Sequence, residues 1–257
     1  WGGGGRGMRV ILKENELENQ INTARREAKS AFGKDDVFFE KLIEKAFHVE
    51  VQIIGDTYGN IVHLFERDCS LQRRHQKVVE RAPAAYISDK EREAICQAGV
   101  RIGKQVDYSC AGTVEFLMNA KSREFFFIEV NPRVQVEHTV TEEITGIDIV
   151  KAQFLLASGG KIGDGICGVP EQQDIKMKGH AIQSRVTTED AANDFAPDYG
   201  KITVYRSASG HGIRLDAGTA ATGTVITPYY DSLLVKVSAK GQSPIEAKQR
   251  MDRALSE

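Results

Sequence analysis

The most informative stretch of this chain is Phe127-Ile128-Glu129-Val130-Asn131-Pro132-Arg133-Val134-Gln135-Val136-Glu137-His138-Thr139. In an extended segment, successive side chains point to opposite faces. One face would then carry two carboxylates, two amides and a guanidinium, from Glu129, Asn131, Arg133, Gln135 and Glu137. Such a row suits a site that holds a metal–nucleotide together with a small anion. The alternative is an exposed polar sheet face, which would not explain the strand that precedes this stretch.

That preceding strand forms the first half of a predicted β-hairpin. Two apolar-rich runs, Thr113–Asn119 and Phe125–Asn131, are separated by five residues. If the turn centres near Ser122, Glu115 lies opposite Glu129 on the same face. Opposed like charges are destabilising unless a cation lies between them, and Mg²⁺ takes one or two carboxylates. A one-residue slip would place Glu115 on the far face and remove the site.

The composition excludes several classes of protein. The 257 residues can form one large or two modest domains. A net charge of −2 with interspersed charges indicates neither a nucleic-acid nor a membrane partner. The 4 cysteines are scattered, which predicts reduced thiols in an intracellular protein and argues against zinc. The termini, at Trp1 and Glu257, lead us to expect a piece of a longer polypeptide.

The N-terminal third is predicted to be mixed. The glycine run at 2–7 could cradle phosphate oxygens with its N–H groups, or it could be a flexible linker. A strand is expected at 8–12, followed by a helix that Asn15 caps and Gly33 ends. Another short strand begins at Val37–Phe39.

Two further strands, Val49–Ile54 and Ile61–Phe65, are expected to pair, and a helix to cover Ser88–Lys104. Between them, Glu66–Lys77 is too charged for a core strand. Its basic half would suit an anionic ligand, but a solvated loop with salt bridges is the favoured interpretation.

Helix signals follow the opening stretch. Thr139 and Glu142 form a capping box for a short helix that ends at Gly146. Asp148 caps a second helix, which Gly159-Gly160 ends.

From Lys178 onward the pattern predicts a smaller β-rich unit, separated from the rest by the Gly-rich stretch 159–168. Its expected strands and final helix are Ala181–Val186, Ile202–Tyr205, Gly212–Leu215, Leu233–Val237 and Pro244–Leu255.

Three motifs in this chain resemble those of the biotin carboxylase component of biotin-dependent carboxylases, members of the ATP-grasp superfamily. They are Gly2–Arg9, Glu66–Lys77 and Phe127–His138. Within that family, Glu142–Lys151 and Phe195–Ala208 look most like the pyruvate carboxylases. The resemblance runs essentially end to end.

The resemblance implies an α+β fold, with an N-terminally truncated ATP-grasp module followed by a β-rich biotin carboxylase C-terminal unit. Residues 1–43 would be part of the lid subdomain with the glycine-rich loop. Residues 44–165 would be the ATP-grasp core with the metal and bicarbonate site, and 176–257 an incomplete C-terminal unit.

The resemblance also implies residue roles. ATP would be bound by the lid residues Gly3, Gly4, Gly5, Arg6, Gly7 and Met8, with Glu40, Lys41, Ile43 and Leu117 around the adenine and His48, Gln72 and His75 around the ribose. Magnesium would be held by Glu115, Glu129 and Asn131, and bicarbonate by Lys77, Arg133, Gln135 and the backbone of Val136. Glu137 would be the general base, and Arg185 would face the biotin ureido oxygen.

The implied function is ATP-dependent carboxylation of biotin by bicarbonate through carboxyphosphate, as the biotin carboxylase part of a pyruvate carboxylase that converts pyruvate to oxaloacetate. Mg²⁺ or Mn²⁺ would assist, and biotin would be carried on another domain. The implied partners are the biotin carrier and carboxyltransferase domains of the same enzyme and a second copy through biotin carboxylase dimers, in the cytoplasm or the mitochondrial matrix. The alternatives are another ATP-grasp ligase, such as a carbamoyl-phosphate synthetase half, or an inactive fragment that serves as an interface module.

Overall fold

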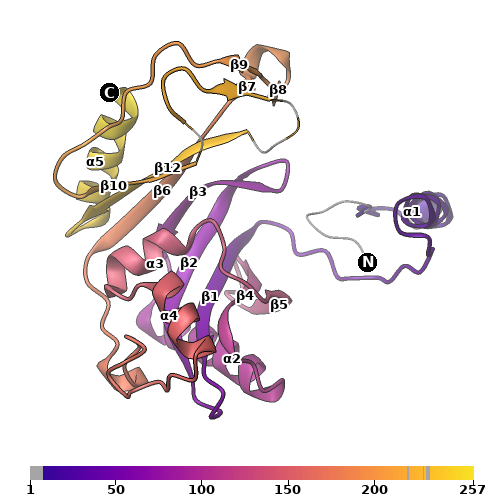
Figure 1. The fold of residues 1–257 in the computed structure, drawn as a ribbon. Helices are drawn as coiled ribbons and strands as arrows, with labels where there is room; N and C mark the ends of the chain where they lie inside the picture. The colour runs from indigo at the N-terminus through magenta and orange to yellow at the C-terminus, as the bar shows by residue number, and fades with distance from the viewer. Residues whose placement is uncertain (1–7, 219, 228, 230–231) are drawn as a thin grey trace.

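A computed structural model describes residues 8–218, 220–227, 229 and 232–257. Figure 1 shows a continuous antiparallel sheet in the strand order β10-β12-β6-β3-β2-β1-β4-β5, with α1 standing apart from it. The strands of this sheet are β1 (Ala46–Gly55), β2 (Ile61–Arg73), β3 (Gln76–Ala82), β4 (Cys110–Asn119), β5 (Phe125–Asn131), β6 (His180–Thr187), β10 (Ile213–Ala217) and β12 (Leu233–Gly241). Two small sheets pair β7 (Glu189–Asp190) with β8 (Ala196–Pro197) and β9 (Gly200–Lys201) with β11 (Val225–Ile226).

Helices cover both faces of the sheet. Those that lie against it are α2 (Asp89–Gln105), α3 (His138–Thr145), α4 (Ile149–Ala157) and α5 (Pro244–Ser256), whereas α1 (Leu17–Phe32) stands apart (Figure 1). Short 3₁₀ turns lie at Glu14–Glu16, Gln172–Asp174 and Ala191–Asn193. Because strand side chains alternate, Val51 packs with α2 while Ile54 packs with α4. Among the described residues, no helix combines the length and apolar character that a membrane crossing needs.

The charged segment Glu66–Lys77 is not a solvated loop, so that interpretation was wrong. It continues β2 to Arg73, turns at Arg74 and His75, and returns as β3. Arg67 is 0% exposed, since charged side chains from neighbouring strands compensate it. Composition misled here because charges that neutralise one another across a sheet can be buried.

The prediction that Arg133–Glu137 is extended was also wrong. β5 ends at Asn131, the chain turns, and α3 begins at His138 with Glu137 as its N-cap. Thr139 therefore lies inside α3 and caps nothing.

The carboxylate of Glu142 accepts a hydrogen bond from the backbone N–H of Ile149 at 2.8 Å, so it serves the next helix rather than a capping box. Gly146 ends α3 in the left-handed conformation, and Asp148 caps α4, both as predicted.

The N-terminal arm differs from expectation in three places. The segments 8–12 and 37–39 are not strands, and a strand requires a hydrogen-bonded neighbour that these segments lack in the described part of the chain. Asn15 lies in a 3₁₀ turn and Glu16 is the N-cap of α1, whereas Gly33 ends that helix as predicted. The predicted phosphate loop of Gly3 to Gly7 lies outside the described residues.

In the C-terminal region, β6, β10, β12 and α5 match predicted elements. Ile202–Tyr205 is not a strand, because pairing there is limited to Gly200–Lys201. The eight-stranded sheet runs through both predicted units, with β3 from one paired to β6 from the other. The predicted boundary between the ATP-grasp core, 44–165, and the C-terminal unit, 176–257, therefore stays a prediction.

Candidate active site

Four charged side chains lie in one row across four neighbouring strands. Glu115 pairs with Glu129 across β4 and β5, which confirms that predicted pair, although a bulge between Glu115 and Phe116 shifts the pairing by one residue relative to the turn. The row then continues, because Glu50 of β1 is the direct partner of Glu115 on one side and of Arg67 on the other. Directly opposed residues share a face of the sheet. The hairpin alone therefore showed only half of the row.

Lys77 lies over this row from β3. Its ammonium contacts the carboxylate of Glu50 and lies 3.0 Å from Glu115 Oε1 and 2.6 Å from Glu137 Oε1. Burial alone would lower the pKa of Lys77, but the surrounding carboxylates outweigh burial and raise it. The lysine is therefore the cation that holds three acidic side chains together.

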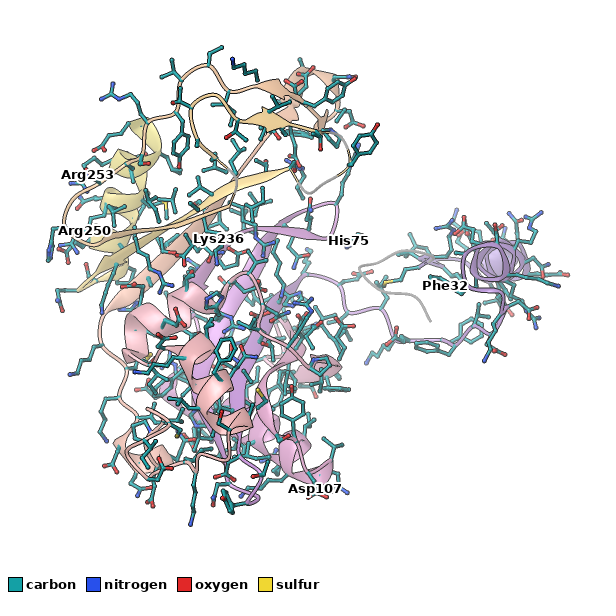
Figure 2. All side chains as sticks on the ribbon, viewed as in Figure 1. Phe32, His75, Asp107, Lys236, Arg250 and Arg253 are labelled. Atoms are coloured by element: carbon teal, nitrogen blue, oxygen red, sulfur yellow. The ribbon has the colours of Figure 1, made fainter. Side chains whose placement is uncertain are left out.

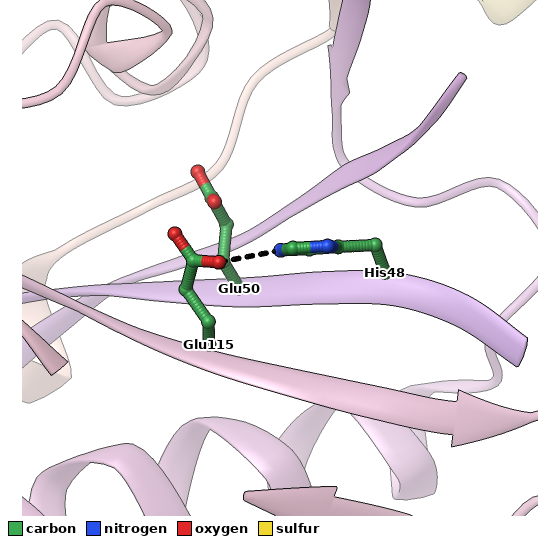
Figure 3. A group of neighbouring side chains, drawn as sticks. All are labelled: His48, Glu50 and Glu115. Atoms are coloured by element: carbon green, nitrogen blue, oxygen red, sulfur yellow. Dashed lines mark ion pairs between the residues drawn. The ribbon is translucent and has the colours of Figure 1, made fainter. Parts of the chain in front are cut away.

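Glu115 is 5% exposed and has side-chain partners on both carboxylate oxygens. Its Oε1 accepts from Asn131 Nδ2 at 2.9 Å and from Gln135 Nε2 at 2.8 Å, in addition to Lys77. Its Oε2 lies 2.7 Å from His48 Nε2 (Figure 3). Burial would raise the pKa of Glu115, but His48 and Lys77 lower it to about 2.

This lowered pKa predicts an acid-dependent loss of stability. The ordinary pKa is 4.5, so charged Glu115 contributes stability above pH 4.5 that is lost as the pH falls toward 2. We expect metal-free Glu115→Gln to be less stable than the wild type by about 2–3 kcal/mol near pH 7, and this gap to narrow below pH 4.5. Urea unfolding between pH 3 and pH 7 measures the gap. A gap that does not change with pH would contradict the assignment.

The second predicted metal ligand, Glu129, is exposed at the end of the row. The amide of Asn131 joins it to Glu115, with Nδ2 lying 3.2 Å from Glu129 Oε1. Arg133 is exposed just beyond and donates to the carbonyl of Val134 at 3.2 Å. The structure thus brings Glu115, Glu129 and Asn131 together.

Glu137 lies where the two halves of the sheet meet. It is 2% exposed, with Oε1 on Lys77 and Oε2 3.1 Å from Arg185 Nη2. Arg185 comes from β6 and also binds Glu80 of β3 at 2.6 Å. Burial raises the pKa of Glu80 to about 7 despite the opposing charge of Arg185. A buried carboxylate is thus held between a lysine from β3 and an arginine from β6.

The backbone of Val136 is also held from the C-terminal half of the sheet. Lys236 of β12, labelled in Figure 2, donates to its carbonyl oxygen at 3.0 Å. The turn that carries Gln135 and Glu137 is therefore fixed from both sides.

The residues predicted around the nucleotide base and sugar fall into separate groups. Lys41 and Ile43 line a cavity of about 420 Å³ together with Phe126, whereas Glu40 is exposed in the arm. Leu117 is half-buried and pairs with His48 across β1 and β4.

His48 Nδ1 lies 3.0 Å from Gln72 Nε2, so these two predicted sugar contacts are adjacent. His75 is exposed at the tip of the β2–β3 hairpin (Figure 2). Met8 of the predicted lid is exposed on the N-terminal arm.

Four residues of the site were missed in the sequence: Glu50, Arg67, Glu80 and Lys236. A signal existed for Glu50, because Val49-Glu50-Val51-Gln52-Ile53 alternates apolar and polar side chains, as a two-faced strand does. Arg67 gave no such signal, because the bulge in β2 interrupts the alternation of side chains just before it. Glu80 lies in β3, which was not predicted, and Lys236 lies in the predicted strand Leu233–Val237 but was not singled out.

The oxygen ligands present fit a divalent hard cation. Mg²⁺ is bound in proteins by one or two carboxylates and retains positions for phosphates and water. Glu115 and Glu129 offer carboxylates on one sheet face, bridged by the Asn131 side chain. A second acidic cluster, His48, Glu50 and Glu115, has its ligand atoms within 4.8 Å of one another, but Lys77 already neutralises it.

Family comparisons agree with this architecture. Residues 1–164 match the family described as "Carbamoyl-phosphate synthase L chain, ATP binding domain", and residues 183–257 match "Biotin carboxylase C-terminal domain". The chain belongs to this family of ATP-binding domains, in the form that continues into a biotin carboxylase C-terminal domain.

The individual relatives are pyruvate carboxylases. The chain is 57% identical to the pyruvate carboxylase of Bacillus subtilis and 55% identical to mitochondrial pyruvate carboxylase of Homo sapiens, over its whole length and 22% of theirs. It thus spans about a fifth of the curated relatives it matches.

Solved structures give the same result. A Rhizobium etli pyruvate carboxylase with the allosteric activator acetyl coenzyme A superposes with a TM-score of 0.96 at 61% identity, covering 100% of this chain and 23% of that one. The biotin carboxylase domain of Hydrogenobacter thermophilus 2-oxoglutarate carboxylase, a dimer with MgADP and bicarbonate, superposes with a TM-score of 0.92 at 43% identity, covering 99% and 55%. The α+β ATP-grasp and biotin carboxylase fold is therefore shown.

Proposed function

We propose that this chain is the biotin carboxylase part of a pyruvate carboxylase and carboxylates biotin with bicarbonate at the expense of ATP. One observation supports this most directly: the buried carboxylate of Glu137 is held between Lys77 and Arg185, 2.6 and 3.1 Å away. Such a carboxylate can accept a proton while two cations hold anionic substrates beside it. The relatives named above support the proposal, because one is named a pyruvate carboxylase and another is named a biotin carboxylase domain.

Bicarbonate would bind between Lys77, Arg133, Gln135 and the backbone of Val136. Arg133 is exposed and can hold a planar anion with two parallel hydrogen bonds. Glu137 would take the bicarbonate proton as a bicarbonate oxygen attacks the γ-phosphorus of ATP. The products of this step are carboxyphosphate and ADP.

Magnesium bound by Glu115, Glu129 and Asn131 would offset charge on the ATP phosphates. The lid residues Gly3 to Met8, the adenine residues Glu40, Lys41, Ile43 and Leu117, and the sugar contacts His48, Gln72 and His75 would bind the rest of the nucleotide. Closure of the lid would keep water from carboxyphosphate, which otherwise hydrolyses.

Carboxyphosphate would break down to CO₂ and phosphate, and the phosphate would remove the proton from biotin N1′. Arg185 would stabilise the negative charge that develops on the ureido oxygen. The deprotonated N1′ would attack the carbon of CO₂, and the carboxyl group so formed would leave the site on biotin N1′.

Biotin would arrive on a carrier domain, and a carboxyltransferase domain would pass the carboxyl group to pyruvate to give oxaloacetate. These partners follow from the relatives, of which this chain spans only a fifth. A dimer of biotin carboxylase units is supported by the dimeric Hydrogenobacter thermophilus domain. The compartment would be the cytoplasm in a bacterium or the mitochondrial matrix in a eukaryote, as the name of the human relative indicates.

The test is ATP hydrolysis that depends on bicarbonate and increases with free biotin. Stimulation by biotin supports the proposal, whereas bicarbonate-dependent hydrolysis without a biotin response points to a carbamoyl-phosphate synthetase half. An interface module would show neither activity nor binding of Mg-ATP by calorimetry. The assay is run both on this chain and on the full-length protein that contains it, because activity of the chain alone is a separate question.

A further inference from the structure

The guanidinium of Arg67 is the most deeply buried cation near the site and has no assigned role. It is 0% exposed on β2, on the face of the sheet that α3 covers. Its nitrogens donate to five side-chain oxygens: Glu50 Oε1 at 2.5 Å, Gln52 Oε1 at 2.7 Å, Thr141 Oγ1 at 2.9 Å, Thr113 Oγ1 at 3.1 Å and Gln135 Oε1 at 3.4 Å. The group thus joins β1, β4, α3 and the turn before α3.

Two of these contacts connect Arg67 to the proposed bicarbonate-binding residues Lys77 and Gln135. Glu50 gives one carboxylate oxygen to Arg67 and the other to the ammonium of Lys77. Arg67 therefore determines where the carboxylate that anchors Lys77 lies.

The second contact orients an amide. Gln135 Oε1 faces Arg67, so its Nε2 faces Glu115, to which it donates at 2.8 Å. A guanidinium only donates and a carboxylate only accepts, so Arg67 and Glu115 together fix which end of the amide faces each of them.

We propose that Arg67 is a positioning residue for bicarbonate, which it places through Glu50–Lys77 on one side and through Gln135 on the other. This inference rests on the proposed function for its substrate. Arginine suits the role because its planar fork presents five donors in fixed directions, whereas a lysine ammonium is a single point charge. Burying a charge costs free energy that an apolar side chain of equal size would not, so sheet stability alone does not account for an arginine here.

The first experiment replaces Arg67 with Lys, which keeps the charge and loses the fork. The matched control is Arg92→Lys. Arg92 is a partly buried arginine that binds the buried carboxylate of Glu66 at 2.9 Å, in the layer of α2 on the opposite face of the sheet. In the full-length protein we expect Arg67→Lys to raise KM for bicarbonate about 10- to 100-fold. This is the factor in binding that corresponds to the free energy of one hydrogen bond to a charged group. The Kd of Mg-ATP should change less than about threefold, within the usual spread for a residue without a direct contact.

Arg92→Lys should lower the melting temperature without changing KM for bicarbonate. Equal changes in KM for the two variants, or an unchanged KM in Arg67→Lys, would overturn the proposal. If Arg67→Lys does not fold, Thr113→Val removes only the oxygen that shares Arg67 Nη2 with Gln135. A two- to fivefold rise in KM is then expected from the loss of one hydrogen bond, and no rise would overturn the proposal.

A second readout requires no turnover. In the ligand-free protein, the side-chain amide NMR signals of Gln135, assigned with Gln135→Glu, should shift in Arg67→Lys and stay in place in Arg92→Lys. An unmoved Gln135 signal would overturn the positioning role. If instead the signal moves while the wild type shows no biotin-stimulated ATPase, the proposed function fails and the role of Arg67 within the side-chain network stands.

Discussion

Glu137→Gln is expected to lower kcat for bicarbonate-dependent ATP cleavage about 1,000-fold, the middle of the range for a general base. The amide has nearly the same shape, but its single oxygen can accept from only one of Lys77 and Arg185, and it cannot take a proton at the position that now lies 2.6 Å from Lys77 Nζ. Binding of Mg-ATP should stay close to the wild type. The measurement is phosphate release in the full-length protein, with and without bicarbonate.

The matched control for this variant is Glu142→Gln. Glu142 is also a buried glutamate, five residues further on, with its carboxylate bound to Arg214 at 2.7 Å rather than to the site. Its kcat should stay within about threefold of the wild type, as expected away from the reacting groups. If Glu137→Gln keeps more than a tenth of the wild-type kcat, Glu137 is not the base.

Lys77→Met is expected to have the largest effect on stability. The change removes the ammonium shared by Glu50, Glu115 and Glu137, and leaves three buried carboxylates facing one another. Deleting one partner of a buried ion pair costs about 3–5 kcal/mol of the free energy of unfolding, and bicarbonate-dependent ATP cleavage should fall with it. Urea unfolding at pH 7 measures the loss.

The pH dependence separates electrostatics from packing in this variant. Without the ammonium, the pKa values of the remaining carboxylates rise, so protonation between pH 7 and pH 5 should recover part of the lost stability. The control is Arg92→Met, which removes a cation that binds the buried Glu66 on the α2 side and should leave bicarbonate-dependent activity unchanged. A Lys77→Met protein as stable as the wild type at pH 7 would refute the central role of this lysine.

Several elements were predictable because their signals are local. Ser88 and Glu91 form a capping box at the start of α2, Asp148 caps α4, and Gly146 ends α3 with a φ of 74°. The hairpin of Glu115 and Glu129 also followed, since a short connection favours pairing of two apolar runs, but the exact pairing depends on a bulge between Glu115 and Phe116 that the sequence did not show. The roles of Lys77, Arg133, Glu137 and Arg185 came from family resemblance and remain predictions.

The wrong predictions share a physical cause. Met8–Leu12 and Val37–Phe39 have strand-like compositions, but a strand forms only against a partner, and a partner is a non-local property. Asn15 and Thr139 are good capping residues in isolation, yet the N-cap of α1 is Glu16 and the N-cap of α3 is Glu137. For α3, the buried bonds of Thr139 to Gln183 and Ser238 outweigh a local cap.

The sequence by itself determined that two apolar-rich runs form a hairpin, because alternation and a short connection are properties of neighbouring residues, while a bulge between Glu115 and Phe116 brings Glu115 opposite Glu129. Only the tertiary structure decided that Arg67 and Glu50 extend this row. β2 contains a bulge opposite Val51–Ile53, with Phe65 at a φ of 66°, which exchanges the two faces of the strand beyond it. Val62 and Leu64 therefore share a face with Arg67, although simple alternation would separate them. The charges meet only once β6, β3, β2 and β1 are aligned in this order in one sheet.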